Sequence, residues 1–404
     1  MHIAFFSPVW PPGSSPSGVV TYISWMRKGL LAQGHRVSIF AGLVAAGEDD
    51  SFTHQVGKSL MDRLRHALTL RRSARYRIFD AEKVIASAIL RTHKIDPIDV
   101  IEMEESFGWA ASVARITKIP MVVKLHGPAF MTLDVDELQT ELGQEKVRRE
   151  GDALRLLPAI IAPSRYVLRD TLARYDIQPS ISEQVGNPVA LADDSQLWDA
   201  CQCDRDTLLF VGRFDRIKGG DLMLLAFQIM LAKRPQLKLV FVGPDNGLLQ
   251  PDGTLIYFKQ FLDSLNDSAL SRAVSYLGRL MPADVAALRP RAFVTAITSR
   301  QENQAYTVLE AMLQGCPVVC TDNAGSSESV QHGVTGMLSR CDDPADIAAQ
   351  LDRLVQQPDL AASLGRAARE YVLRTHSPEA VVGKTVNVYQ RAIETQRVKR
   401  AGAR

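Results

Sequence analysis

The stretch "TLLFVGRFDRIKGGDLMLLAFQIMLAKRPQLKLVFVGP", Thr207 to Pro244, contains one complete strand–helix–strand repeat. Its two ends, "TLLFVGR" and "KLVFVGP", are short continuous apolar runs, which is typical of strands buried on both faces of a parallel sheet. Between them, "DLMLLAFQIMLAK" indicates a helix that stops before Pro235. Because strand, helix and parallel strand form a right-handed crossover, this stretch predicts an α/β fold.

The same repeat continues on both sides of this stretch. Further strands are predicted at "AVSYLG", "AFVTAITS" and "PVVCTD" in the second half, and at "HIAFFSP", "RVSIFAG", "DVIEME", "MVVKLHG" and "AIIAPS" in the first. A polar segment without periodicity, Gly186 to Asp206, separates the two series. We therefore predict two doubly wound, Rossmann-like domains facing a central cleft, where ligands lie beyond the carboxyl ends of the strands.

The domain boundaries follow from this seam. We expect an N-terminal, acceptor-side domain at 1–188 and a C-terminal, nucleotide-sugar-binding domain at 189–375. A helix at about 376–404 is expected to pack back on the first domain. A length of 404 residues fits two domains of roughly 100–200 residues each.

Composition excludes several classes of protein. The formal net charge is only +2, so no global field favours nucleic acid as a partner. Five scattered cysteines, an odd number, indicate reduced thiols in the cytoplasm and not a disulfide framework. The N-terminus lacks the pattern of a signal peptide, and no run approaches the ~18 apolar residues of a membrane span.

Two cations mark the loop after the first strand of the second half. Arg213 and Lys218 stand in "GRFDRIKGG", before a helix expected to start near Gly220. A guanidinium and an ammonium beside a helix N-terminus are suited to binding a diphosphate. The alternative is a pair of solvated loop cations. "KGG" is not a Walker A loop, because the rest of that motif is missing.

Two glutamates flank a predicted helix in "ENQAYTVLEAM". Glu302 lies outside the helix, which is expected from about Thr307 to Gln314, and Glu310 is expected in its first turn. The pattern T-x-x-E from Thr307 to Glu310 also has the form of an N-terminal capping box. Free amides at the helix start could take a phosphate, at Tyr306, Thr307 and Val308.

Two residues of the first half also follow predicted strands. His126 comes directly after "MVVKL", at the sheet edge where ligands bind, and its ring could exchange a proton or bind a sugar hydroxyl. Gly18 lies in a Ser/Pro-rich loop before a helix, where glycine lets an anion approach. The alternatives are a loop histidine bound by backbone groups and a connection without a ligand. The spacing is not G-x-G-x-x-G, which argues against a nicotinamide dinucleotide.

Together these motifs resemble the retaining glycosyltransferases of family 4, which have the GT-B fold. The two glutamates have the E-x7-E spacing of that family. The resemblance continues through "LEAMLQGCPVVCTDNAGSSE", "HGVTGML", "GRFDRIKGG", "YLGRL", "APSRYV", "HG" and "LLAQGHRVSIF". These motifs span nearly the whole chain in the family's order.

The resemblance implies a role for each matching residue. Arg213 and Lys218 would hold the donor diphosphate, His126 and Glu302 would contact the transferred sugar, and Glu310 would bind the ribose. The other implied donor-binding residues are Gly18 and Gly212 near the diphosphate, Arg279 and Leu280 near the base, and the helix start at Tyr306, Thr307 and Val308. The loop after Glu302 departs from the family's glycines and phenylalanine, and carries Asn303, Gln304, Ala305 and Tyr306. This departure concerns the identity of the sugar.

The implied function is a hexosyltransferase-type reaction that needs no cofactor or metal. A UDP- or GDP-sugar would be the donor, and a hydroxyl of a glycan, a lipid-linked or a small-molecule acceptor would be glycosylated, in polysaccharide or glycolipid biosynthesis. The alternatives are a non-catalytic nucleotide-sugar-binding relative, and a disaccharide synthase or phosphorylase on the same fold. Two D-x-D triplets, at 134–136 and 204–206, lie in polar connections and are not expected to bind a metal.

Two further segments concern the acceptor side. Residues 58–77 carry seven Lys or Arg side chains, one acid and leucines at helical spacing. Such a helix could rest on the anionic inner face of a membrane, or pack by its leucines with a solvated basic face. "EMEES", with Glu102, Glu104 and Glu105, could contact an acceptor or form a solvated loop.

Overall fold

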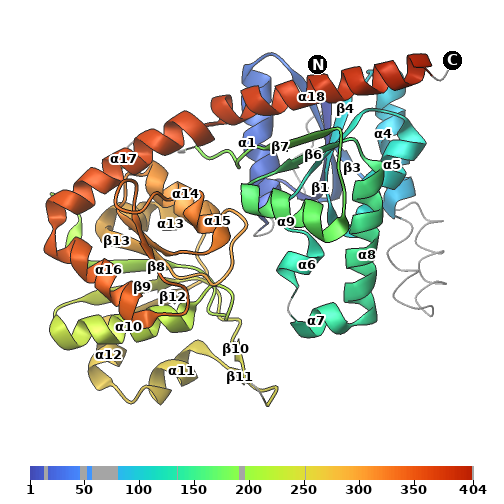
Figure 1. Ribbon diagram of the computed structural model, residues 1–404. Coiled ribbons are helices and arrows are strands. Elements are labelled where there is room, and N and C mark those ends of the chain that lie inside the picture. Colours follow the sequence, from blue (N-terminus) through green and yellow to red (C-terminus); the bar gives the residue numbers. More distant parts are fainter. Residues whose placement is uncertain are drawn as a thin grey trace. The chain divides into compact units, whose positions relative to one another are not determined.

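The chain forms two compact α/β units. The computed structural model (Figure 1) describes residues 1–12, 17–45, 52–56, 81–133, 135–190, 196–250 and 252–402. Unit 1 consists of Met1–Pro188 with Pro378–Arg404, and unit 2 consists of Val189–Ser377. The final helix therefore belongs to unit 1, although it follows unit 2 in the sequence.

Unit 1 is built on a parallel sheet of seven strands in the order β3-β2-β1-β4-β5-β6-β7. The strands are β1 (His2–Trp10), β2 (Arg36–Val44), β3 (Thr53–Gln55), β4 (Val100–Glu104), β5 (Met121–Lys124), β6 (Ala159–Ala162) and β7 (Ile181–Gln184). The four residues of β5 and of β6 are all buried, because helices cover both faces of the sheet.

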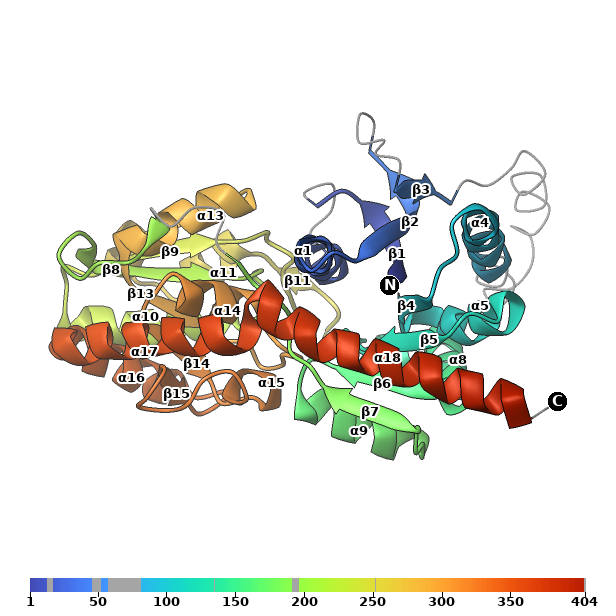
Figure 2. The ribbon, with the colours of Figure 1, turned by 90° about the horizontal axis from the view of Figure 1, so that it is seen from above.

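The helices of unit 1 form two layers around this sheet (Figure 2). They are α1 (Gly18–Ala32), α4 (Ala81–Ile95), η1 (Ser106–Gly108), α5 (Trp109–Thr117), α6 (Ala129–Thr132), α7 (Val135–Gln139), α8 (Glu141–Leu156), α9 (Arg165–Tyr175) and α18 (Pro378–Gly402). Helix α1 packs against α18, whereas α4 packs against α5 and α5 against α8. Side chains alternate along a strand, so Ile101 and Met103 share a cluster with α4 and α5, while Glu102 meets Tyr389 of α18.

Unit 2 has a second parallel sheet, of six strands, in the order β12-β9-β8-β13-β14-β15. Its strands are β8 (Asp204–Val211), β9 (Lys238–Val242), β12 (Val274–Gly278), β13 (Ala292–Ile297), β14 (Val318–Thr321) and β15 (Met337–Ser339). A small antiparallel hairpin joins β10 (Leu248–Leu249) and β11 (Leu255–Ile256).

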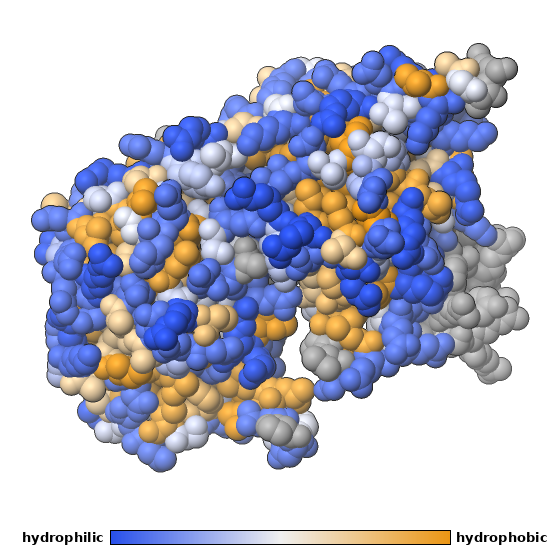
Figure 3. All heavy atoms as spheres, viewed as in Figure 1, coloured by the Kyte–Doolittle hydropathy of each residue, from blue (hydrophilic) through white to orange (hydrophobic). Residues whose placement is uncertain are grey.

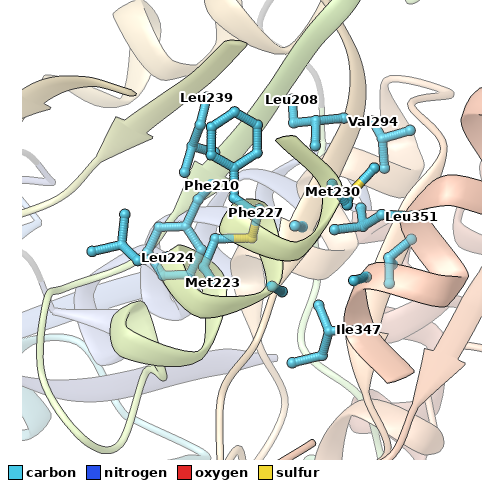
Figure 4. Packing of buried hydrophobic residues seen from close by; sticks show 14 of the residues in the cluster. Leu208, Phe210, Met223, Leu224, Phe227, Met230, Leu239, Val294, Ile347 and Leu351 are labelled. Carbon is cyan, nitrogen blue, oxygen red and sulfur yellow. The ribbon is translucent and has the colours of Figure 1, made fainter. Parts of the chain in front are cut away.

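The core of unit 2 explains the stretch from Thr207 to Pro244. Helix α10 (Gly220–Lys233) is apolar on nearly all sides because it is enclosed by the sheet and by α16 (Pro344–Gln356). Figure 4 shows Phe227 of α10 among Phe210, Leu239 and Leu351. The remaining helices are α11 (Phe258–Ser264), α12 (Ser268–Ala273), α13 (Pro282–Leu288), η3 (Arg289–Arg291), α14 (Tyr306–Leu313), α15 (Ala324–Ser327) and α17 (Pro358–His376).

The predicted fold class is confirmed: each strand expected from the sequence is present, in two parallel sheets. The last helix begins at Pro378, because α17 ends at His376 and a proline starts the next helix.

Hydrophilic residues line most of the outer side of α17 and α18 (Figure 3), while Val382 and Tyr389 are fully buried. Among the described residues, no helix has the length and apolar content needed to cross a membrane.

Candidate active site

The loop between β8 and α10 carries both predicted cations. The Arg213 side chain is 43% exposed, and its Nε lies 2.5 Å from Oδ2 of Asp215. The other carboxylate oxygen of Asp215 accepts a 2.8 Å hydrogen bond from the backbone N–H of Lys218. Asp215 therefore connects the two ends of the loop. Within the described part of the chain, Arg213 is contacted only through Nε, which leaves the two terminal nitrogens of the guanidinium for an anion.

Gly219 brings this loop against the end of β13. Its φ is +65°, in the left-handed region, and a Cβ at this position would lie 2.0 Å from the carbonyl oxygen of Thr298. The Thr298 hydroxyl donates a 2.6 Å hydrogen bond to the Gly219 carbonyl. Only glycine combines this conformation with so close an approach of two backbones.

The closest contact between the predicted catalytic residues joins Lys218 and Glu302. Nζ of Lys218 lies 2.7 Å from Oε1 of Glu302, whose side chain is only 8% exposed. The hydroxyl of Ser299 donates to the same oxygen at 2.8 Å. Strands β8 and β13 are neighbours and parallel, so the loops that follow them meet at one edge of the sheet.

A third residue, Arg300, ties these two loops together. Its guanidinium forms two hydrogen bonds to Asp221, of 2.8 and 2.7 Å, and its backbone N–H donates to the Ile217 carbonyl at 2.8 Å. It also contacts the carboxylate of Asp342. Sequence reasoning missed Arg300 and Asp221, because no spacing pattern marks a pair that is 79 positions apart.

The start of α14 corrects two details of the sequence analysis. The N-cap is Ala305, with no side-chain capping bond, so Thr307 lies inside the helix and is not its cap. Because the helix begins at Tyr306, Glu310 lies at the start of the second turn and not, as predicted, in the first turn. The amides of the first turn therefore have no side-chain acceptor from the N-cap residue.

Glu310 has a partner that the motif does not reveal. Its side chain is 35% exposed, and its Oε2 lies 2.5 Å from Nη2 of the buried Arg289. Arg289 comes from η3, before β13, where nothing in the local sequence pattern distinguishes it from a surface residue.

Glycines bring the ends of β8, β9 and β12 close together. The N–H of Gly212 donates to Val242, and the N–H of Gly243 donates to Gly278 at 2.8 Å. A Cβ on Gly243 would lie 1.9 Å from the Gly212 carbonyl oxygen. Arg279 and Leu280 directly follow β12, so the predicted diphosphate and base positions lie along the same sheet edge.

In unit 1, His126 follows β5 and contacts α1. The ring of Tyr22 meets the imidazole edge-on, with 5.0 Å between the ring centroids. Tyr22 is one turn after Gly18, the first residue of α1. Among the described residues, the N-cap Ser17 makes no side-chain capping bond to the start of α1.

The loop of His126 is held by a buried carboxylate. Glu105 accepts hydrogen bonds from the backbone N–H groups of His126 and Gly127, the shortest being 2.6 Å. Removal from water lowers the pKa of His126 to about 3, and the charge of Lys124 adds to this effect. The imidazole is therefore neutral at physiological pH.

The segment "EMEES" is not a solvated loop. Glu102 and Glu105 are 2% and 3% exposed, respectively. Burial raises the pKa of Glu102 and of Glu105. It also raises the pKa of Glu104, to about 7. Glu102 accepts a 2.7 Å hydrogen bond from Tyr389, so it joins α18 to the sheet.

Two family models match the chain. The model described as "Glycosyl transferases group 1" matches residues 202–371, and "Glycosyltransferase Family 4" matches residues 16–193. The chain belongs to the family 4 glycosyltransferases. The predicted enzyme class is thereby confirmed.

Curated relatives of this family 4 glycosyltransferase include two D-inositol 3-phosphate glycosyltransferases. The protein of Thermobispora bispora is 32% identical over 201 residues, 47% of this chain and 44% of the relative. The chain thus spans less than half the length of that relative in the match. The protein of a Nocardioides species is 25% identical over 405 residues, with 96% of this chain and 88% of the relative covered.

Solved structures confirm the GT-B fold of the glycosyltransferase. Sucrose-phosphate synthase of Thermosynechococcus elongatus superposes with a TM-score of 0.73 at 19% identity, covering 98% of this chain and 99% of that one. HepE of Anabaena in complex with UDP-glucose superposes with a TM-score of 0.65 at 16% identity, covering 98% and 99%.

Some predictions for the glycosyltransferase stay untested. The basic segment at 58–77 lies outside the described residues, as does Asp134 of the first D-x-D triplet. Within the described part of the chain, no group of three or more His, Cys, Asp or Glu residues could hold a metal ion. The second triplet is used locally, because Asp204 accepts from Thr207 and pairs with Lys238.

Proposed function

We propose that this glycosyltransferase moves a sugar from a UDP-sugar to an acceptor hydroxyl, with retention of anomeric configuration and without a metal ion. The contact between Lys218 and Glu302, beside the uncapped start of α14, is the observation that carries the proposal. The likeness to HepE, which was solved with UDP-glucose, supports uridine as the base and UDP-glucose as the first donor to test.

The diphosphate is the leaving group, and its developing charge needs stabilisation. An ammonium has three donors; Glu302 takes one from Lys218, which leaves two for phosphate oxygens. The free terminal nitrogens of Arg213 and the amides at Tyr306, Thr307 and Val308 add further donors around the same loops. Preorganised donors of this kind stabilise charge without reorganisation, and they supply the role that a metal ion plays in other transferases.

Each of the other site residues contacts a different part of the donor. Glu302 has a second carboxylate oxygen that can accept from a hydroxyl of the transferred sugar. Glu310, whose side chain is 35% exposed on α14, accepts from the ribose hydroxyls, and the backbone at Arg279 and Leu280 meets the base. Gly212 and Gly18 allow close approach of the diphosphate.

His126 contributes as a neutral group. With a pKa of about 3, its imidazole cannot serve as a cation beside the diphosphate at neutral pH. It can hydrogen-bond a sugar hydroxyl in a fixed orientation, because Glu105 and Tyr22 hold its backbone and its ring. Its proposed role is to orient the donor sugar near the reacting carbon.

The proposed acceptor is a small hydroxyl compound. The two relatives described above are both named for D-inositol 3-phosphate, which makes a phosphorylated polyol the first acceptor class to test. Glycan and lipid-linked acceptors are the next classes.

The test measures release of nucleoside diphosphate from four donors: UDP-glucose, UDP-N-acetylglucosamine, GDP-mannose and ADP-glucose. Each donor is incubated with D-inositol 3-phosphate, with a glycan acceptor and with a lipid acceptor. Every reaction is repeated in the presence of a chelator. We expect release of UDP, unaffected by chelator, and a product whose anomeric proton shows the configuration of the donor. Binding of UDP without release from any donor would instead identify a non-catalytic nucleotide-sugar-binding protein. Sugar release that requires inorganic phosphate would identify a phosphorylase.

A further inference from the structure

Arg289 is a cation buried inside unit 2, next to the proposed ribose-binding residue. It is the first residue of η3, between α13 and β13, and its side chain is 3% exposed. A guanidinium cannot lose its charge at physiological pH, so its burial requires hydrogen-bond partners. Among the described residues the structure provides two, Glu310 of α14 and Gln314, the C-cap residue of that helix.

The two partners lie on one face of α14. Nη2 of Arg289 lies 2.5 Å from Oε2 of Glu310, and Nη1 donates to Oε1 of Gln314 at 3.2 Å. Glu310 and Gln314 are four positions apart, so their side chains neighbour each other on the helix. Arg289 therefore spans one turn of α14.

Gln314 fixes the guanidinium from the other side. It is 1% exposed, and its Nε2 donates to the carbonyls of Ala286, at 2.8 Å, and Gln196, at 2.9 Å. The amide orientation of Gln314 is thus set by two backbone acceptors, which leaves its oxygen facing Arg289. Nε of Arg289 is buried without a hydrogen-bond partner among the described residues, so the charge is balanced mainly by Glu310.

This arrangement leaves part of Glu310 for a ligand. Among the described residues, only Oε2 of Glu310 takes part in a side-chain hydrogen bond, and 35% of the side chain is exposed. The hydrogen bond from the buried guanidinium restricts the rotation of the Glu310 carboxylate. A carboxylate held in this way can accept from adjacent ribose hydroxyls without first being ordered.

We infer that Arg289 is a positioning residue for recognition of the donor ribose. It acts through Glu310, with Gln314 as its support, and it sets how strongly the enzyme prefers a ribonucleotide to a 2′-deoxyribonucleotide. This inference rests on the proposed function, in which Glu310 binds the ribose.

The experiment compares binding of UDP and 2′-deoxy-UDP by isothermal titration calorimetry. Wild type should bind UDP about tenfold to a hundredfold more tightly than 2′-deoxy-UDP, as expected for one charge-assisted hydrogen bond. Arg289→Gln should reduce this ratio to near one. Arg289→Lys should give an intermediate ratio, because an ammonium replaces the charge but not the two-pronged geometry. If Arg289→Gln does not fold, Arg289→Lys and Gln314→Met are measured in the same way.

Kinetics adds a readout that a purely structural role would not change. The KM for UDP-glucose should rise in Arg289→Gln with kcat little affected, because the ribose is bound equally in the ground and transition states. Arg234→Gln is the matched control, since it removes the partner of Asp352, another ion pair of unit 2, between α10 and α16. It should lower the melting temperature and leave the ratio of UDP to 2′-deoxy-UDP affinity unchanged.

Two outcomes would overturn the inference and are distinguishable. If Glu310→Ala leaves the ratio unchanged, Glu310 does not bind the ribose, and that part of the proposed function fails along with the inference. If Glu310→Ala abolishes the preference but Arg289→Gln and Arg289→Lys keep it, the proposed function stands and Arg289 is only a structural cation.

Discussion

At the scale of single residues, the site depends on the contact between two loops. Gly219 allows the backbone of the Lys218 loop to approach Thr298, and this contact brings the ammonium within 2.7 Å of Glu302. The sequence shows a Gly–Gly pair before a helix, but it does not show what Gly219 touches. A side chain at this position should therefore affect both stability and donor binding.

Gly219→Ala tests this contact. The left-handed conformation costs an alanine about 1–3 kcal/mol, and the clash with the Thr298 oxygen adds to this. Gly253→Ala is the matched control, because Gly253 has φ +83° but no atom within 4 Å of its Cβ position. Urea denaturation should show a larger loss of unfolding free energy for Gly219→Ala, and calorimetry a loss of UDP binding in that variant alone. Equal effects of the two substitutions would contradict the proposed role of this close contact.

The site residues that lie in a sequence motif could be predicted. Those that join the site only through a tertiary contact could not. Lys218 and Glu302 both follow predicted strands, and the structure brings them together. Arg289 and Arg300 were missed, since neither lies in a recognisable motif and only tertiary contacts connect them to Glu310 and Asp221. The helix start was misplaced by one residue, because the T-x-x-E pattern at Thr307 occurs inside the helix and is not used as a cap.

At the scale of elements, prediction worked for central strands and failed mostly at edges. β1, β8 and β13 each contain a continuous apolar run, because helices cover both faces of a central strand. The edge strands β3, β7 and β15 were not predicted. They have only three or four residues and contain polar residues, since an edge strand has fewer neighbours to bury it.

Near His126, a buried carboxyl group of α8 connects this helix with its neighbours. No strand or helix pattern in the sequence indicates such a contact. Glu150 of α8 accepts from the N–H of Ala129 at 2.8 Å and from the hydroxyl of Tyr175 at 3.3 Å. Burial, followed by the charge of Glu105, raises the pKa of Glu150 to about 8. Helix α8 is therefore joined to the loop after β5 by a carboxyl group that is protonated at neutral pH.

Glu150→Gln tests this protonation state. The folded pKa of about 8 lies above the ordinary value of 4.5, so wild type loses unfolding free energy as the pH rises from 4.5 to 8. Glutamine is always neutral and escapes this loss. Urea denaturation should show the variant gaining on wild type, on the order of 1 kcal/mol per pH unit at most, between pH 5 and 8. A difference that does not change with pH would show that Glu150 is ionised in the folded protein. Glu141→Gln, at an exposed position of α8, is the control.

At the scale of the whole molecule, the two sheets and the order of the motifs carry the family assignment. The fold class could be predicted because the strand–helix repeat recurs along both halves of the chain. The donor sugar and the acceptor could not, since they depend on a few hydrogen bonds from loops. In the loop after Glu302, Asn303 to Tyr306 differ from the family's pattern, and the spacing of elements carries no information about such contacts.

In the proposed function, Lys218 holds the donor diphosphate where the loops after β8 and β13 meet. The most direct measurement is the affinity for UDP, by isothermal titration calorimetry, of wild type, Lys218→Met and the control Lys259→Met. Lys259 is 84% exposed, and among the described residues it pairs only with Asp263 of its own helix.

We expect Lys218→Met to fold and to bind UDP at least about tenfold more weakly than wild type, because a charge-assisted contact is lost and Glu302 is left beside the phosphates. Lys259→Met should bind UDP as wild type does. Undiminished UDP affinity in a folded Lys218→Met protein would contradict this role of Lys218.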